Sequence, residues 1–269
     1  MDKSTVIGIL VGVGGILAGL LLEGGTLNQV VQPTAAMIVF GGTLGAVLIQ
    51  FPLPVILSAA QRLKDVFAEP RRQPSATISV LVGYANKARK QGIVSLDAEL
   101  SQVEDAFMKK SLMLAVDGTE PRELREIMEL ELDCIAEHDE EIPKVFESAG
   151  GFSPTIGIIG AVLGLIQVMQ HLDNIDEVGR GIAVAFVATI YGVGAANLLF
   201  LPCAGKLKAR IKEEQAIRQM TLEGVVSILE GINPRMLQTK LGGFLTDAAP
   251  VEVANKEGKQ WQENASTST

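Results

Sequence analysis

The sequence is poor in the residues that build a large aromatic core or a metal centre. Aromatic residues make up 4% of its 269 positions, and it has two cysteines, two histidines and one tryptophan. Cys134 and Cys203 lie far apart, without the short spacing typical of a zinc site or a disulfide framework. The net charge of −8 lacks the basic excess of most nucleic-acid binders. These absences argue against a metalloprotein and against a partner made of nucleic acid.

Charged residues are also missing from four long stretches, although they make up 20% of the chain. Each stretch is mostly apolar and approaches or exceeds the roughly 20 residues that a helix needs to cross a bilayer. The stretches are Ser4–Leu22, Gly24–Gln61, Ser148–Leu172 and Gly181–Gly205. We therefore predict an all-α membrane protein with four transmembrane helices, and a soluble enzyme is disfavoured.

Small residues recur at helical spacing in the first two predicted membrane helices, where they let helix backbones approach closely. The pairs are Gly8 and Gly12, Gly15 and Gly19, and Gly41 and Gly45. The second helix is predicted at about Thr34–Leu57. Pro52 and Pro54 are expected to stop or kink it at the membrane interface.

Polar residues and prolines gather in the third helix, predicted at Phe152–Gln170, and in the fourth, at about Gly181–Cys203. Thr189 and Asn197 either hydrogen-bond between helices or line a water-filled path, and the spacing leaves both readings open. None of the four helices contains Asp, Glu, Lys or Arg. An ion relay through hydrocarbon normally needs an ionisable group, so if this chain conducts ions, another subunit must supply the carboxylate.

The basic residues predict the orientation. All but one of the 23 Lys and Arg residues fall in the two terminal segments and in the segment between the second and third helices; the exception is Arg180. By the positive-inside rule these three segments are cytoplasmic. We predict a multi-pass membrane protein with both termini in the cytoplasm.

This topology divides the chain into five regions. Residues 1–61 hold the first pair of membrane helices, 62–147 a helical cytoplasmic domain, and 148–205 the second pair of membrane helices. Residues 206–245 form a cytoplasmic C-terminal helical region, and the polar tail 246–269 is expected to be disordered.

Apolar periodicity predicts four helices in the cytoplasmic regions. Ser75–Gln91 is followed by Gly92 as a stop, and a second helix is expected with Ser95 as its N-cap. A third begins near Thr119 and continues toward the third membrane helix. The fourth covers Lys206–Glu230 and ends before Pro234.

Two charged patches admit more than one interpretation. Arg89 and Lys90 end a predicted helix, and Asp97 and Glu99 follow after a short turn. They either complement the helix dipole in a solvated loop or form a docking surface of both signs. The acidic run Glu137–Glu141 is interpreted as a solvated helix face rather than a metal site.

Several segments resemble the MotA family, the channel-forming stator subunits of the bacterial flagellar motor. The most specific are Gly-Gly-Phe-Ser-Pro-Thr-Ile-Gly-Ile-Ile-Gly at Gly150–Gly160 and Gly-Ile-Ala-Val-Ala-Phe-Val-Ala-Thr-Ile-Tyr-Gly at Gly181–Gly192. Ala-Arg-Lys-Gln-Gly-Ile-Val-Ser-Leu-Asp at Ala88–Asp97 and Gly-Ile-Asn-Pro at Gly231–Pro234 are also similar. The resemblance extends from the first membrane helix to about Leu245.

The resemblance implies a location in the bacterial inner membrane, with the ion path in 148–205 and a rotor-facing domain in 62–147. It also implies an assembly and a mechanism. Members form a ring, thought to contain five copies, around two copies of a MotB-type peptidoglycan-binding partner whose transmembrane helix carries the ion-binding Asp. Ion flow turns the ring, and its cytoplasmic charges push the rotor switch protein. No enzymatic activity, cofactor or bound metal is implied.

The resemblance also assigns roles to individual residues. Pro154 and Pro202 match the two mechanistic prolines of the family. Arg89 and Asp97 match its rotor-facing charges, with Lys90 beside them; Asp97 replaces the usual Glu, and Glu99 is expected to share its role.

Ion choice depends on a pair of positions. Sodium-driven relatives typically have a Thr where this chain has Ala161, beside a Thr that Thr189 matches. Ala161 has no hydroxyl, so this chain lacks one of the oxygen ligands that Na⁺ would need. This difference favours H⁺ as the transported ion.

Two other functions remain alternatives. The ExbB/TolQ family shares the channel core but energises outer-membrane processes, and its chains have three membrane helices with the insert after the first. A passive membrane scaffold accounts for the glycine pairs but not for the Pro, Thr and Asn of the third and fourth helices.

Overall fold

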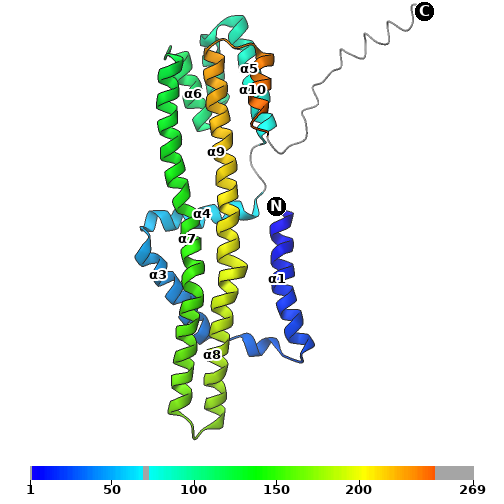
Figure 1. Cartoon of the computed structure of the whole chain (residues 1–269), viewed down its shortest axis with the longest axis vertical. Coiled ribbons are helices and arrows are strands. Elements are labelled where there is room, and N and C mark those ends of the chain that lie inside the picture. Colours follow the sequence, from blue (N-terminus) through cyan, green and yellow to red (C-terminus); the bar gives the residue numbers. More distant parts are fainter. Residues whose placement is uncertain (1, 69–72, 246–269) are drawn as a thin grey trace, which may run out of the picture. The chain divides into compact units, whose positions relative to one another are not determined.

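A computed structural model describes residues 2–68 and 73–245. The predicted disordered tail, 246–269, lies outside the described residues. Within them every regular element is a helix (Figure 1). The chain forms two compact units, Met1–Arg71 with Glu131–Gln215, and Arg72–Leu130 with Ala216–Thr269.

Four helical segments are long and apolar enough to cross a membrane, as the sequence predicts. The first is α1 (Lys3–Leu22). The second covers η1 (Leu27–Val30), α2 (Pro33–Ala36), the π-helix η2 (Met37–Gly41) and α3 (Gly42–Gln50). The third lies within α7 (Pro121–Gln170), and the fourth within α8 (Ile175–Ala195), the π-helix η4 (Ala196–Phe200) and α9 (Leu201–Leu229).

The second membrane helix is shorter than the predicted Thr34–Leu57. It ends at Gln50, and Phe51 is extended, with φ −118° and ψ 143°. The residue before a proline is disfavoured in helical geometry, and Pro52 itself has no N–H to continue the ladder. A separate helix, α4 (Leu53–Phe67), then begins, with Pro54 in its first turn.

The helix predicted from Thr119 toward the third membrane helix is confirmed as the continuous α7. It passes through Gly150 and Gly151 without a break and contains both Pro143 and Pro154 in its interior. Pro154 therefore lies in the interior of a helix, where a proline is costly, and not in the first turn, where it is tolerated. The helix predicted at Lys206–Glu230 likewise has no separate start, because α9 begins at Leu201 directly after η4.

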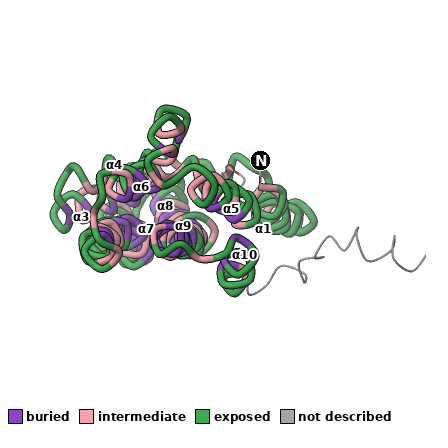
Figure 2. The backbone as a smooth tube through the Cα atoms, turned by 90° about the horizontal axis from the view of Figure 1, so that it is seen from above, coloured by how far each residue is buried: buried purple, intermediate pink, exposed green. Residues whose placement is uncertain are grey.

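Apolar clusters of described residues hold the first unit together. One joins α3, α4, α7 and α9, and the other joins α2 and η2 to α8. The buried positions of Figure 2 lie mostly where helices face one another, whereas α1 has no buried residue. A Cβ added at Gly8, Gly15 or Gly19 would meet nothing within 4 Å, so most of the predicted glycine ridge of α1 faces open space in the single chain.

The second unit consists of α5 (Pro74–Gln91), the 3-10 helix η3 (Ile93–Gln102), α6 (Ala106–Val116), α10 (Pro234–Gly242) and parts of α7 and α9. α5 packs against η3 and α10, and α6 packs against η3. The Leu81 side chain packs against Gly224 of α9, because a Cβ added at Gly224 would lie only 2.6 Å from a methyl group of Leu81. The predicted α-helix capped by Ser95 is wrong: the segment is η3, and Ser95 lies inside it with its hydroxyl donating to the Gly92 carbonyl at 2.6 Å.

Candidate functional site

The third and fourth membrane helices meet along a seam without side chains. A Cβ added at Gly157 would lie 2.9 Å from the carbonyl oxygen of Ala188. A Cβ added at Gly164 would lie 2.8 Å from the carbonyl oxygen of Gly181. At Gly192 an added Cβ would lie 2.6 Å from the carbonyl oxygen of Ser153. Contacts this short admit only glycine, so the backbones of α7 and α8 touch directly.

Pro154 lies at this seam. Its Cα would be 3.2 Å from a Cβ added at Gly192. Because proline has no N–H, the carbonyl of Gly150 loses its usual helical donor. Gly150 in turn faces α9, since its added Cβ would lie 2.7 Å from a methyl group of Leu201. A carbonyl released from its helix thus occurs one turn from the point where α7 and α8 touch.

Pro202 follows a π-helix. η4 covers Ala196–Phe200, and Pro202 is the second residue of α9 and is exposed. A proline inside a helix clashes with the carbonyl four residues earlier, and the wider π turn relieves such a clash. The two prolines are linked through neighbours, because Gly150, one turn before Pro154, contacts Leu201, the residue before Pro202.

The two positions tied to ion choice, Ala161 and Thr189, are half-buried. Gly160 and Ala188 contact each other, because a Cβ added at Gly160 would lie 2.8 Å from the Cβ of Ala188. Ala161 is the next residue after Gly160, and Thr189 is the next residue after Ala188. The hydroxyl of Thr189 donates to the Ala185 carbonyl at 3.2 Å. That bond uses the hydroxyl proton and leaves oxygen lone pairs available for a cation.

Sequence reasoning missed three polar groups near this seam. Tyr191 of α8 donates its hydroxyl to the Val30 carbonyl at 2.6 Å and accepts from the Gln32 N–H at 3.2 Å, which ties α8 to the start of the second membrane helix. Among the described residues, the buried hydroxyls of Ser153 and Thr43 have no hydrogen-bond partner. The sequence shows only that these three residues lie inside charge-free stretches. Their burial and their hydrogen bonds could not be predicted, because they depend on neighbours distant in the chain.

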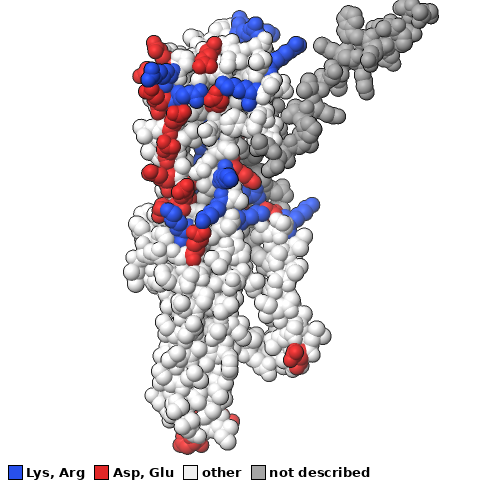
Figure 3. Space-filling model, viewed as in Figure 1, with Lys and Arg blue, Asp and Glu red and all other residues white. Residues whose placement is uncertain are grey.

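The hairpin that carries the seam is free of charge on the face shown in Figure 3, except at its turn. Acidic residues surround that turn, where His171 binds Glu177 with 3.2 Å between Nε2 and a carboxylate oxygen. The other charged side chains of the first unit lie at the two ends of α1, on α4, on α7 before Ser148 and at the start of α9. This pattern is that of a segment buried in hydrocarbon between two polar boundaries.

The second unit presents the charges assigned to the rotor surface. Arg89 and Lys90 occupy the last turn of α5, which ends at Gly92 with a φ of +83° that favours glycine. Both side chains and that of Asp97 in η3 are exposed, and none forms an ion pair with a described residue. The structure thus leaves three charges of two signs accessible around one helix end.

Glu99 differs from Asp97. Its carboxylate lies 2.5 Å from the ammonium of Lys87, and both side chains are about one-third exposed. Burial, together with the nearby charge of Glu99, raises the pKa of Tyr84 above its ordinary value. Glu99 therefore holds η3 against α5, whereas Asp97 is free to meet a partner.

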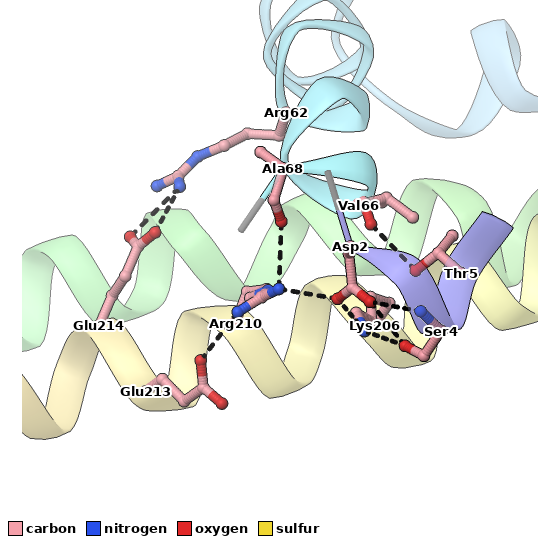
Figure 4. Close-up of polar contacts among 10 residues, drawn as sticks. All are labelled: Asp2, Ser4, Thr5, Arg62, Val66, Ala68, Lys206, Arg210, Glu213 and Glu214. Atoms are coloured by element: carbon pink, nitrogen blue, oxygen red, sulfur yellow. Dashed lines mark hydrogen bonds and ion pairs between the residues drawn. The ribbon is translucent and has the colours of Figure 1, made fainter. Parts of the chain in front are cut away.

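The acidic run contains one residue that is not solvated. Asp139 is 4% exposed and lies 3.3 Å from the guanidinium of Arg62, which also binds Glu214 at 3.1 Å and Asp65 at 3.4 Å. Burial opposes the charge of Arg62, but the hydrogen bonds and carboxylates around it prevail and raise its pKa. Figure 4 shows the contact with Glu214. The interpretation of the whole run as a solvated face is thus wrong at Asp139, because a cation from α4 reaches it.

Two protein-family models match most of the chain. Residues 6–92 match the model of the motility protein A N-terminal region, and residues 99–220 match that of the MotA/TolQ/ExbB proton channel family. Motility protein A of Bacillus subtilis is 36% identical over 246 residues, covering 91% of each chain.

Two solved structures are similar over most of the chain. The structure of C. jejuni MotAB aligns with a TM-score of 0.87 and 33% identity, covering 93% of this chain and 98% of the other. The flagellar MotAB stator complex from Bacillus subtilis aligns with a TM-score of 0.82 and 36% identity, covering 89% and 94%.

Proposed function

The chain belongs to the motility protein A (MotA) family and is a stator subunit of the bacterial flagellar motor; we propose that it couples inward ion flow to torque on the rotor. The observation that carries this proposal is the α7–α8 seam. There, two charge-free helices touch backbone to backbone beside Pro154 and a carbonyl released from its helix. Such a contact transmits a small change at the ion path directly to a helix that continues outside the membrane.

The ion-binding group belongs to a partner in this mechanism. A relay through hydrocarbon needs an ionisable side chain, and the apolar stretches of this chain have none. We propose that a MotB-type peptidoglycan-binding subunit supplies a transmembrane Asp. Proton exchange on that Asp would be felt at the Gly150 carbonyl and at Pro154, where the hinge of α7 lies.

A ring of identical chains completes the channel, and the family resemblance implies five copies. Support comes from α1, whose residues are all at least partly exposed, and from the large aliphatic side chains that α7 exposes within its span, such as Ile158, Val162 and Leu165. Lipid or neighbouring chains must cover this surface. The open glycines of α1 suit a neighbouring helix, because they allow close approach.

We further propose that both termini and the segment 62–147 are cytoplasmic, with 148–205 carrying the ion path and 206–245 returning to the cytoplasmic side. Cys134 is exposed and Cys203 is 5% exposed. In intact cells a membrane-impermeant thiol reagent should leave Cys134 unlabelled, and permeabilisation should make it react. A Cys134→Ser variant gives the background, and labelling of Cys134 before permeabilisation would reverse the orientation.

The rotor surface consists of Arg89, Lys90 and Asp97, facing the rotor switch protein with Glu99 as a supporting residue. Exposed charges of both signs give specificity and orientation more than affinity. Because Glu99 is already paired with Lys87, we expect it to contribute through the position of η3 rather than by contact.

Charge reversal tests this surface. Arg89→Glu should reduce swimming speed a few-fold without preventing ring assembly, since exposed pairs contribute on the order of 1 kcal/mol or less. Adding Asp97→Lys should deepen the defect, and a reversed charge on the rotor should recover part of it. Lys109→Glu is the matched control: it reverses another exposed cation of the same unit that has no partner among the described residues. Equal swimming of the Arg89 and Lys109 variants at all loads would rule out the assigned surface.

We propose H⁺ as the transported ion. A Na⁺ ion needs several oxygen ligands, whereas at the level of the Gly160–Ala188 contact this chain offers the Thr189 hydroxyl but only a methyl group at Ala161. Swimming should therefore stay constant when external Na⁺ is replaced by K⁺ at fixed proton-motive force. Speed that follows external Na⁺ under those conditions would show a sodium-driven stator.

A deletion strain tests the function as a whole. Cells that lack this chain and any second stator should build normal filaments that do not rotate, and re-expression should restore swimming. Normal swimming combined with defective outer-membrane uptake would instead support the ExbB/TolQ alternative. Normal swimming and uptake together would support a passive scaffold.

A further inference from the structure

An open recess lined by charged side chains lies where α1 begins and α9 leaves the apolar region. Its volume is about 530 Å³. Its lining comes from the start of α1 and from one face of α9: Asp2, Lys3, Ser4, Lys206, Ala209, Arg210 and Glu213. All of these residues belong to the first unit.

A network of ion pairs shapes the recess (Figure 4). Asp2 caps α1 by accepting from the Ser4 N–H, and its carboxylate lies 2.5 Å from the Lys206 ammonium and 3.0 Å from the Arg210 guanidinium. Arg210 also donates to the Ala68 carbonyl at 3.1 Å. The hydrogen bond from Lys206 is the main reason that the pKa of Asp2 lies well below its ordinary value, so Asp2 stays ionised at any physiological pH.

Among the described residues, the lining keeps an excess of positive charge. Lys3, Lys206 and Arg210 contribute three cations, whereas Asp2 and Glu213 contribute two carboxylates. Glu213 pairs with Arg210 at 3.4 Å. Lys3 is exposed and forms no ion pair with a described residue, so its ammonium is available to an anion. A single negative charge would balance these described groups.

The position of the recess indicates which anion reaches it. Lys3 begins the first membrane segment, and Lys206 is the first charged residue after the charge-free stretch Gly181–Gly205. Immediately along α1, the side chains of Ile7, Leu10 and Val11 are more than half exposed. A ligand here therefore meets cations at one end and an open aliphatic surface at the other. Basic pockets beside membrane helices on the cytoplasmic side are typical sites for anionic lipid headgroups.

We propose that this recess binds the headgroup of an anionic glycerophospholipid with one phosphodiester charge, such as phosphatidylglycerol. The phosphate lies against the Lys3 and Lys206 ammonium groups, and the acyl chains lie along the exposed face of α1. Asp2 remains in place as the helix cap and holds Lys206 and Arg210 in position. The lipid thereby fixes the start of α1 at the membrane boundary, a role separate from ion conduction and from rotor contact.

The test uses the purified complex of this chain with its partner subunit, delipidated and titrated with phosphatidylglycerol or phosphatidylcholine. Bound lipid is counted by native mass spectrometry. Lys3→Gln is the informative variant, because Lys3 has no partner among the described residues and its loss leaves the Asp2 network intact. Lys212→Gln is the matched control: Lys212 is also exposed and unpaired among the described residues, lies on α9, and does not line the recess.

The proposal expects saturable binding of phosphatidylglycerol in preference to phosphatidylcholine. Lys3→Gln should raise the dissociation constant about fivefold, the effect of one lost cation beside an anionic lipid. Lys212→Gln and Lys3→Arg should bind like the unmodified chain, and millimolar inorganic phosphate should not compete. Equal binding of the two lipids, or equal binding by the Lys3→Gln and Lys212→Gln variants, would overturn the proposal. Displacement by inorganic phosphate would also overturn it, because the recess would then be a soluble-anion site.

Discussion

Replacing Gly192 by alanine should separate α7 from α8 and stop the motor. The new Cβ would lie 2.6 Å from the Ser153 carbonyl oxygen and 3.1 Å from the Gly157 Cα, and both are backbone atoms that cannot rotate away. Overpacking of a close contact typically costs about 1–3 kcal/mol. We expect a lower melting temperature of the purified complex in detergent and the loss of swimming.

Gly194→Ala is the matched control for this substitution. Gly194 lies in the same helix, two residues further on, and a Cβ added there would meet nothing within 4 Å. Alanine in an open helical position stabilises by about 0.5–1 kcal/mol relative to glycine. Swimming should therefore persist in Gly194→Ala. If Gly192→Ala melts and swims like Gly194→Ala, the seam does not depend on glycine, and the proposed transmission between the two helices loses its basis.

The second large effect is expected for Pro154→Ala, which should abolish rotation while the complex stays assembled. The substitution restores an N–H for the Gly150 carbonyl, and proline inside a helix is about 3 kcal/mol less favourable than alanine. Stability should thus be kept or increased, since the Cα that faces Gly192 and the glycine seam remain. The measurements are swimming speed and co-purification with the partner subunit.

Pro143→Ala provides the comparison within the same helix. Pro143 is also an interior proline of α7, but it lies outside the charge-free stretch Ser148–Leu172. The same chemical change there should leave rotation largely intact. Normal rotation of Pro154→Ala would show that neither the free carbonyl nor the hinge is needed for coupling. An equal loss in both variants would point to the shape of α7 as a whole rather than to the ion path.

The membrane helices could be predicted from the sequence because their signal is local. A stretch of apolar residues without charge has one low-energy environment whatever the rest of the chain does, so the four spans and the break at Pro52 follow from the order of residues alone. The continuity of α7 from Pro121 onward was predicted for the same reason, since the apolar periodicity runs through the membrane boundary.

The roles of individual residues were less accessible. Asp97 and Glu99 look equivalent in the sequence, yet Glu99 is paired with Lys87, twelve positions earlier, and Asp97 is exposed. Asp139 looks like the other acids of its run, but Arg62 of another helix reaches it. The segment after Gly92 forms a 3-10 helix because its packing against α5 and α6 overrides the capping signal of Ser95.

Glycine shows the same division most clearly. The sequence predicts close helix contact for the paired glycines of α1, and it makes no such prediction for the glycines of α7 and α8. In the single chain most of the α1 glycines face open space, whereas Gly157, Gly164 and Gly192 lie against backbone atoms. The sequence determined by itself which segments cross the membrane, because burial in lipid depends on each segment's own composition. Only the tertiary structure decided which charges are free and which glycines touch, because those properties depend on atoms that distant parts of the chain bring close.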